Sequence, residues 1–231
     1  MEFARTLAGR EHSAPVGFGS KINWLSIRSC DVMQVADALI RCGLVRAPRL
    51  TGLASWLRLL RVRNSFRASR LIKLEPLALE AAIDTAYRNP TQILLIGPVN
   101  GWVLVLNGSA TGSPGDFAPL AELSTHFGEA QCFGSHRVSD FFAWACAREG
   151  VVTRAVVNAD GWHEFGEETA CEKSLRKIKQ DAEAQPLGED WWSVDEDDVV
   201  AVACSWSIDP TRLGFVGSSM NPPAWRIFWS D

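Results

Sequence analysis

The sequence has little tyrosine and histidine and lacks any long apolar run. It holds one tyrosine and four histidines in 231 residues. No stretch approaches the roughly 18 consecutive apolar residues of a membrane-spanning helix. Residues 1–20 also lack the apolar segment of a signal peptide. These absences predict a cytoplasmic protein with no transmembrane segment.

Closely spaced cysteines are missing as well. The chain contains no Cys-x-x-Cys pair, and its cysteines are scattered from one end to the other: Cys30, Cys42, Cys132, Cys146, Cys171 and Cys204. Zinc sites and disulfide-rich scaffolds need closely spaced or paired cysteines. The spacing therefore predicts reduced thiols, and no metal or other cofactor.

The formal net charge is −4, which gives the whole chain no electrostatic attraction to nucleic acid. The charge is nevertheless unevenly distributed. Residues 46–73 contain eight basic residues and no acidic one, whereas residues 181–198 contain eight acidic residues and no basic one. Either stretch is a candidate surface for binding a partner. The alternative is that the basic and acidic stretches face one another within the fold.

The order of apolar patterns predicts an α+β fold with a mainly antiparallel sheet. A strand at residues 21–29 precedes a helix with a cap at Asp31 and a stop at Gly43. Two apolar runs flank the turn at residues 97–101, a helix follows at residues 117–128, and a β-meander covers residues 130–168. This order is that of a ferredoxin-like split βαβ core with an added meander and C-terminal helices. We expect a flexible leader at residues 1–21 and one domain at 22–231, with a basic helical insertion at 46–76.

The insertion reads as an amphipathic helix. Apolar side chains recur at helical spacing within residues 53–60, and basic side chains surround them. The corresponding basic patch is Arg58, Arg61, Arg63 and Arg67. Such a helix usually packs on its own domain, and the alternative is association with a membrane surface or nucleic acid through residues 46–73.

The acidic stretch near the C-terminus is the candidate recognition surface. Tryptophan is frequent at interface hot spots, and acidic residues suit a basic target. The proposed binding residues are Trp191, Trp192, Asp195, Asp197 and Asp198. Ser193 and Glu196 have the spacing of a capping box, which predicts that a helix begins here. Acidic residues in the first turn of a helix are stabilised by its dipole, so this role, and not a metal site, is expected for the aspartates.

Residues 126–140 hold the main candidates for chemistry. Cys132 and His136 are four residues apart in an expected strand, which puts them on one face, and His126 and Asp140 lie nearby in sequence. A small cytosolic enzyme that uses these residues is the alternative function. No Gly-x-Ser-x-Gly motif accompanies them, and a metal would need further ligands. We therefore expect no enzymatic site.

Four segments resemble a group of uncharacterised bacterial proteins: NGWVLVLNG, LSTHFGEAQCFGSHRV, AWACAREG and DEDDVVAVACSWSIDPTRL. That group has a Gly-Trp hairpin and a C-terminal helix with a Trp-Ser-x-Asp-Pro motif, and it is similar in style to immunity-type proteins. The likeness covers roughly residues 22–45 and 78–215. It implies a non-catalytic protein that binds a cognate toxin or effector. It assigns no functional residue and leaves the oligomeric state open.

Overall fold

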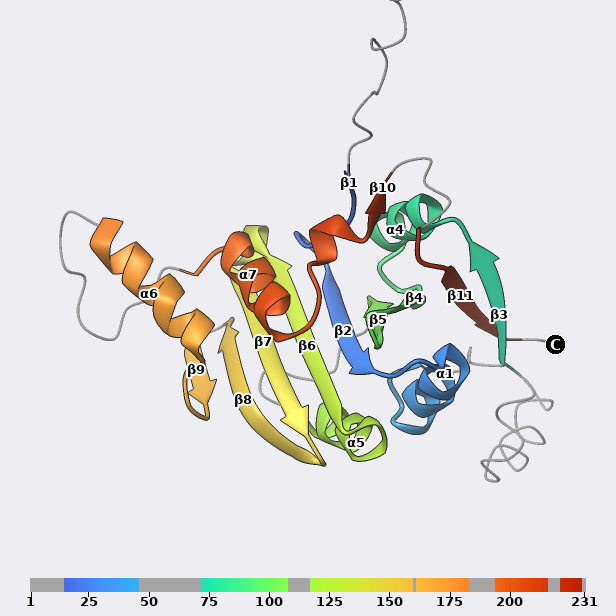
Figure 1. Ribbon diagram of the computed structural model, residues 1–231, viewed down its shortest axis with the longest axis horizontal. Helices are drawn as coiled ribbons and strands as arrows, with labels where there is room; N and C mark the ends of the chain where they lie inside the picture. The colour runs from blue at the N-terminus through green and yellow to red at the C-terminus, as the bar shows by residue number, and fades with distance from the viewer. Residues whose placement is uncertain are drawn as a thin grey trace, which may run out of the picture.

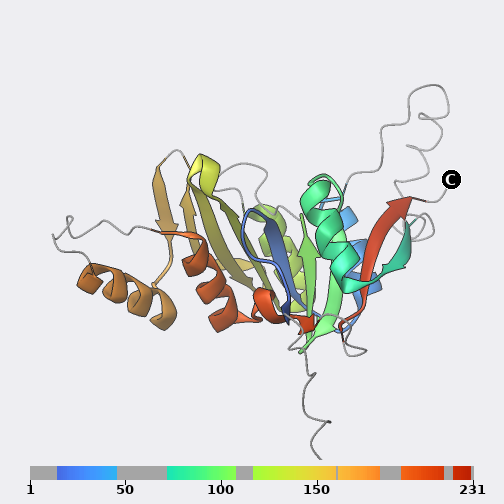
Figure 2. The ribbon, with the colours of Figure 1, turned by 90° about the horizontal axis from the view of Figure 1, so that it is seen from above.

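A computed structural model describes residues 15–45, 72–107, 117–159, 161–182, 194–215 and 221–229. Its main feature is a nine-stranded antiparallel sheet with helices on both faces (Figure 1 and Figure 2). A separate two-stranded sheet pairs β1 with β10. The predicted α+β class and the mainly antiparallel sheet are confirmed.

The elements have the following bounds. The strands are β1 (Pro15–Val16), β2 (Asn23–Arg28), β3 (Ile72–Leu77), β4 (Leu94–Val99), β5 (Trp102–Leu106), β6 (Glu129–His136), β7 (Phe141–Arg148), β8 (Val151–Asn158), β9 (Trp162–Phe165), β10 (Gly214–Phe215) and β11 (Ala224–Trp229). The α-helices are α1 (Val32–Arg41), α4 (Leu79–Arg88), α5 (Ala118–Phe127), α6 (Ala170–Ala182) and α7 (Glu196–Trp206).

The strand order is β3-β11-β4-β5-β2-β6-β7-β8-β9, and every neighbouring pair is antiparallel. β2 therefore lies at the centre, although it is the first strand of this sheet along the chain. The four strands from β6 to β9 follow one another as the meander that the sequence predicts. β3 and β9 form the two ends of the sheet (Figure 1).

Two apolar layers hold the helices to the sheet. All five residues of β5 are buried. Leu104 and Leu106 face the first layer, and Val103 and Val105 face the second. The first layer joins the sheet to α4, α6 and α7, and the second joins it to α1 and α5. A strand with apolar residues on both faces is typical of a sheet covered on both sides. The central strands therefore form the core.

Local capping explains where the helices begin and end. The Asp31 side chain accepts hydrogen bonds from the backbone N–H groups of Met33 (2.9 Å) and Gln34 (3.0 Å), which fixes the start of α1 as the sequence predicts. α5 ends at Gly128, whose φ of 77° favours glycine. α5 therefore stops where the chain turns into β6.

Parts of the predicted leader and insertion are described. Within residues 1–21, Val16 and Phe18 are buried in the first apolar layer. Of the predicted insertion 46–76, residues 46–71 lie outside the described residues, and the remainder belongs to β3. Among the described helices, none has both the length and the apolar character needed to cross a bilayer.

Candidate functional site

Two of the predicted binding residues and the whole basic patch lie outside the described residues. These are Trp191, Trp192, Arg58, Arg61, Arg63 and Arg67. The prediction for them remains a prediction. The three aspartates of the acidic stretch are described.

Asp195 and Asp198 form the start of α7. Asp195 is the N-cap, and its Oδ1 accepts hydrogen bonds from the N–H groups of Asp197 (2.9 Å) and Asp198 (3.1 Å). Asp198 Oδ2 accepts from the N–H of Asp195 at 2.8 Å, which completes a capping box two residues later than the Ser193–Glu196 spacing predicts. Lys179 Nζ of α6 donates to both carboxylates, at 2.7 and 2.6 Å. The Asp197 side chain is exposed and takes no part in these hydrogen bonds.

The contact between Lys179 of α6 and the two aspartates of α7 depends on charge. Burial acts to raise the pKa of Asp195, but the charge and hydrogen bond of Lys179 together with the hydrogen bonds from the N–H groups of Asp197 and Asp198 hold that pKa below its usual value. Asp195 thus stays ionised at neutral pH. The pair of aspartates therefore fastens the start of α7 to α6. The predicted role of these two residues in binding a partner remains a prediction.

The Cys, His and Asp candidates near residue 136 do not come together. Cys132 is buried in the second apolar layer. His136 is exposed, with Nδ1 3.1 Å from Ser139 Oγ, and Asp140 and His126 are also exposed. Over the described ranges, no group of three His, Cys, Asp or Glu side chains is arranged to hold a metal ion. The geometry provides no joint proton transfer among these four residues.

The thiols provide a direct test of this arrangement. All six cysteines are free, and burial raises the pKa of Cys132 to about 12 and that of Cys146 to about 11. Because only the thiolate is a strong nucleophile, iodoacetamide at about pH 8 should label exposed Cys30 while Cys132 and Cys146 stay unlabelled until the protein unfolds. Peptide mass spectrometry of briefly treated native protein measures this. Labelling of Cys132 or Cys146 as fast as Cys30 would contradict the buried geometry.

Glu129 forms a polar cluster on the first-layer face of the sheet. Its carboxylate accepts hydrogen bonds from Gln131 Nε2 (2.9 Å) and Arg148 Nη2 (3.1 Å) and lies 3.6 Å from Arg28 Nη1. Burial acts to raise the Glu129 pKa, but the bonds from Gln131 and Arg148 outweigh it and the pKa is lowered. These partners neutralise and hold the carboxylate. The cluster is therefore a stabilising network at a strand end.

A hollow lies between α5 and β9 on the second-layer face, and we call it the α5–β9 groove. Its volume is about 510 Å³. It is lined by Phe117, Ala118, Ala121, Val152, Ala155, Val157, His163, Glu164 and Phe165. The lining is mostly apolar, which is typical of binding sites.

Small side chains and missing helix cover create the groove. Ala118 and Ala121 form the wall on α5, and Ala155 and Val157 form the floor on β8. On this face α5 packs over β6, β7 and β8, and among the described elements no helix packs over β9. The ring of Phe165 consequently stays 61% exposed.

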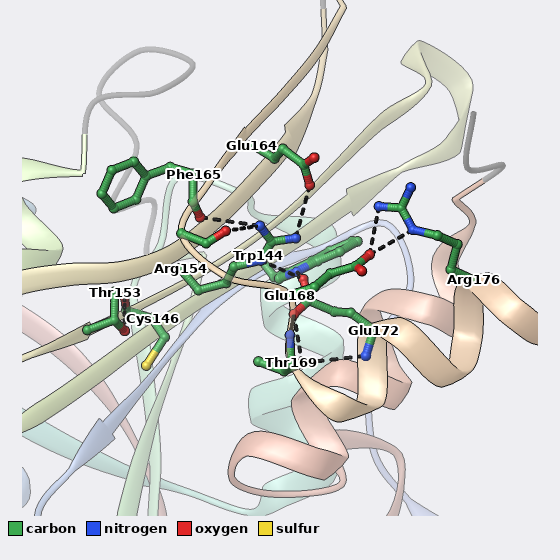
Figure 3. Close-up of polar contacts among 11 residues, drawn as sticks. Trp144, Cys146, Thr153, Arg154, Glu164, Phe165, Glu168, Thr169, Glu172 and Arg176 are labelled. Atoms are coloured by element: carbon green, nitrogen blue, oxygen red, sulfur yellow. Dashed lines mark hydrogen bonds and ion pairs between the residues drawn. The ribbon is translucent and has the colours of Figure 1, made fainter. Parts of the chain in front are cut away.

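The outer wall of the groove is anchored from the opposite face of the sheet (Figure 3). Arg154 of β8 donates from Nη2 to Glu164 Oε2 (3.1 Å), and from Nη1 to the carbonyls of Phe165 (3.3 Å) and Gly166 (2.8 Å). Its Nε donates to Glu172 Oε1 at 2.8 Å. One buried arginine thus ties both β9 and the first turn of α6 to β8.

Glu172 is fully engaged in this network. Its Oε1 also accepts from Trp144 Nε1 at 2.8 Å, and its Oε2 accepts from the N–H and Oγ1 of Thr169, both at 2.7 Å. The carboxylate is completely buried, and its four hydrogen bonds offset the loss of water. It has no remaining capacity to act on a substrate, so the network positions the wall of the groove.

Sequence reasoning missed the α5–β9 groove. The only local signal is the segment WHEFGEE, which combines aromatic and acidic residues in and just after an edge strand. The helix and floor residues of the groove are alanines and valines, which carry no chemical signature in a sequence. The groove depends on how far the helices extend over the sheet, which only the fold defines.

Comparison of the chain with models of known protein families, with curated proteins and with solved structures gave no match.

Proposed function

We propose that this protein acts by binding another protein, and that the α5–β9 groove is its contact surface. The observation that carries the proposal is an apolar hollow of about 510 Å³ beside the exposed Phe165. Exposed aromatic side chains next to a pocket are typical anchors of protein interfaces. The described residues near the groove offer no arrangement of catalytic side chains.

A protein segment fits the groove better than a small ligand does. The groove is partly open to solvent, and His163 supplies the main polar side chain in a lining that is otherwise apolar, because the Glu164 carboxylate lies on the opposite face. A site for a small molecule usually encloses its ligand and fixes it with several convergent polar groups. One wall here is an edge strand, whose backbone can hydrogen-bond to another chain.

The resemblance to immunity-type bacterial proteins names the class of partner. We propose that a cognate toxin or effector is the target and that the protein neutralises it in the bacterial cytoplasm. The net charge of −4 supports this proposal, because an acidic protein captures a basic target faster. Masking a target by binding requires no catalytic group, so we propose that the protein is not an enzyme.

We also propose that the scaffold is a ferredoxin-like split βαβ core with additions. Support comes from the strand order β4-β5-β2-β6, in which β5 lies between β4 and β2, and from the packing of α1 and α5 in the same apolar layer. β7, β8 and β9 extend this core on one side. The groove lies where this extension passes the last helix of the core.

A groove-filling variant tests the proposed contact surface. Ala121→Phe should place a ring in the α5–β9 groove and reduce capture of the partner from a native-host extract at least tenfold, a factor typical of blocking an interface hot spot. The matched control is Ala81→Phe, an alanine-to-phenylalanine change at an exposed position of α4. Quantitative mass spectrometry of pull-downs measures both, with the neighbouring gene product included.

Two outcomes would contradict the proposal. If Ala121→Phe and Ala81→Phe capture the same partner equally, the groove is not the contact surface. If the unmodified protein captures no protein at all, the function is not protein binding.

A further inference from the structure

We infer that the partner contributes an extended segment that adds as a tenth strand along β9 and carries an apolar–basic–apolar sequence. This inference rests on the proposed function and specifies how the α5–β9 groove is used. Three features carry it: the open backbone edge of β9, the alternation of its side chains, and its excess negative charge.

The backbone of β9 has one open edge. β9 is the last strand of the sheet, and over the described residues its neighbour is β8 alone. Ala159 N donates to Gly161 O at 3.3 Å, so the alternation of an antiparallel ladder directs the backbone groups of His163 and Phe165 toward β8. The N–H and C=O of Glu164 then point to the open edge, where another strand can pair with them.

The side chains of β9 alternate between the two faces of the sheet. His163 is opposite Val157 and Phe165 is opposite Ala155, and all four lie on the groove face. Glu164 lies on the other face, where it meets Arg154. A strand added along β9 therefore places the residue opposite Glu164 on that other face, and the residues on either side of it face the groove.

The charge around Glu164 favours a basic residue at the central position. Arg154 is the single positive charge shared by Glu164 and Glu172, so this group carries a net negative charge. The Glu164 side chain is 42% exposed. No lysine or arginine occurs between residues 155 and 172. A lysine or arginine opposite Glu164 would complement this charge across the strand pair.

A second copy of this chain cannot pair with the same edge in the register of full overlap. Full antiparallel overlap of two β9 strands would set Trp162 opposite Phe165. Those side chains lie on opposite faces, because Trp162 packs in the first layer and Phe165 lines the groove. Opposite residues in a strand pair must share a face. A foreign segment has no such conflict.

The test uses synthetic peptides and the full chain. The probe is the capped heptapeptide Gly-Ser-Phe-Arg-Val-Ser-Gly, and its matched controls are the same peptide with an N-methylated arginine amide and a reordered peptide with Arg-Phe-Val at its centre. We expect saturable binding of the probe below about 1 mM and at least tenfold weaker binding of each control. Glu164→Lys should weaken binding of the probe by a similar factor. Titration calorimetry measures all of these.

A second readout separates strand addition from mere occupation of the groove. In the complex with the probe, hydrogen exchange at the Glu164 amide should slow at least tenfold, because that N–H becomes bonded to the added strand. Unchanged exchange, equal binding of the N-methylated peptide, or no binding of the probe would overturn strand addition. None of these results would affect the Ala121→Phe test of the groove. A dimer seen by light scattering and disrupted by Glu164→Lys would also overturn the addition of a partner strand, because a second copy of this chain would then occupy the edge of β9.

Discussion

Arg154→Met is expected to lower the free energy of unfolding by about 3–5 kcal/mol. The substitution removes the cation from Glu172, whose carboxylate is completely buried, and leaves that charge uncompensated in the core. It also frees the carbonyls of Phe165 and Gly166 from the bonds that hold the end of β9. Urea denaturation followed by tryptophan fluorescence measures the change.

The matched control for Arg154 is an exposed ion pair. Arg88 lies 2.9 Å from Asp84 on the surface of α4, where water screens both charges. Arg88→Met should cost about 0.3–0.5 kcal/mol, as is usual for exposed helix pairs. Similar losses for the two variants would show that the Arg154 network adds little to stability.

Trp24→Ala is expected to cost about 3–5 kcal/mol. Trp24 is only 1% exposed and lies between two rings: Phe18 edge-on with centroids 5.4 Å apart, and Phe133 stacked at 5.1 Å. Removing the indole leaves a cavity at the central strand and deletes both ring contacts. Thermal and urea unfolding should both shift, because β2 pairs with β5 on one side and β6 on the other.

Phe165→Ala is the matched aromatic control for Trp24. Its ring is mostly exposed in the α5–β9 groove, so its removal should change the free energy of unfolding by no more than about 0.5 kcal/mol. A loss as large as that of Trp24→Ala would mean that the groove is part of the core, which would contradict its role as a contact surface.

Elements with local signals could be predicted from the sequence. α1 follows from the Asp31 cap and the apolar spacing after it, and α5 follows from its stop at Gly128. The meander from β6 to β9 follows from short strands joined by turns such as Glu149-Gly150, both with positive φ. In each case the residues that define the element lie next to one another in the chain.

Elements made by distant pairing were missed. Residues 72–76 fall within the expected basic helical insertion at 46–76, but Ile72–Leu77 form β3, and the next helix begins at Leu79. Pro76 is tolerated in this strand because β3 is an edge strand. Its partner β11 is not among the strands that the sequence predicts, since no local pattern links two strands this far apart.

The candidate site was hard to predict for a different reason. Arg154 lies in the apolar segment VVTRAVVNA, and nothing in that segment reveals that its partner is Glu172 on a helix eighteen residues later. The acidic residues of α7 have several registers with capping potential, and the structure uses Asp195 with Asp198. Buried pairing and cap choice both depend on tertiary contacts, which a single sequence does not display.

The position of β11 between β3 and β4 has a consequence for biosynthesis. Arg226 of β11 bonds to Glu75 of β3, and these residues are 151 positions apart. At ribosomal rates of about 5–20 residues per second, β3 emerges about 8–30 s before the strand that must join it to the sheet. Throughout that interval β4 presents an edge without its final neighbour, and β3 cannot join the sheet until β11 has been synthesised.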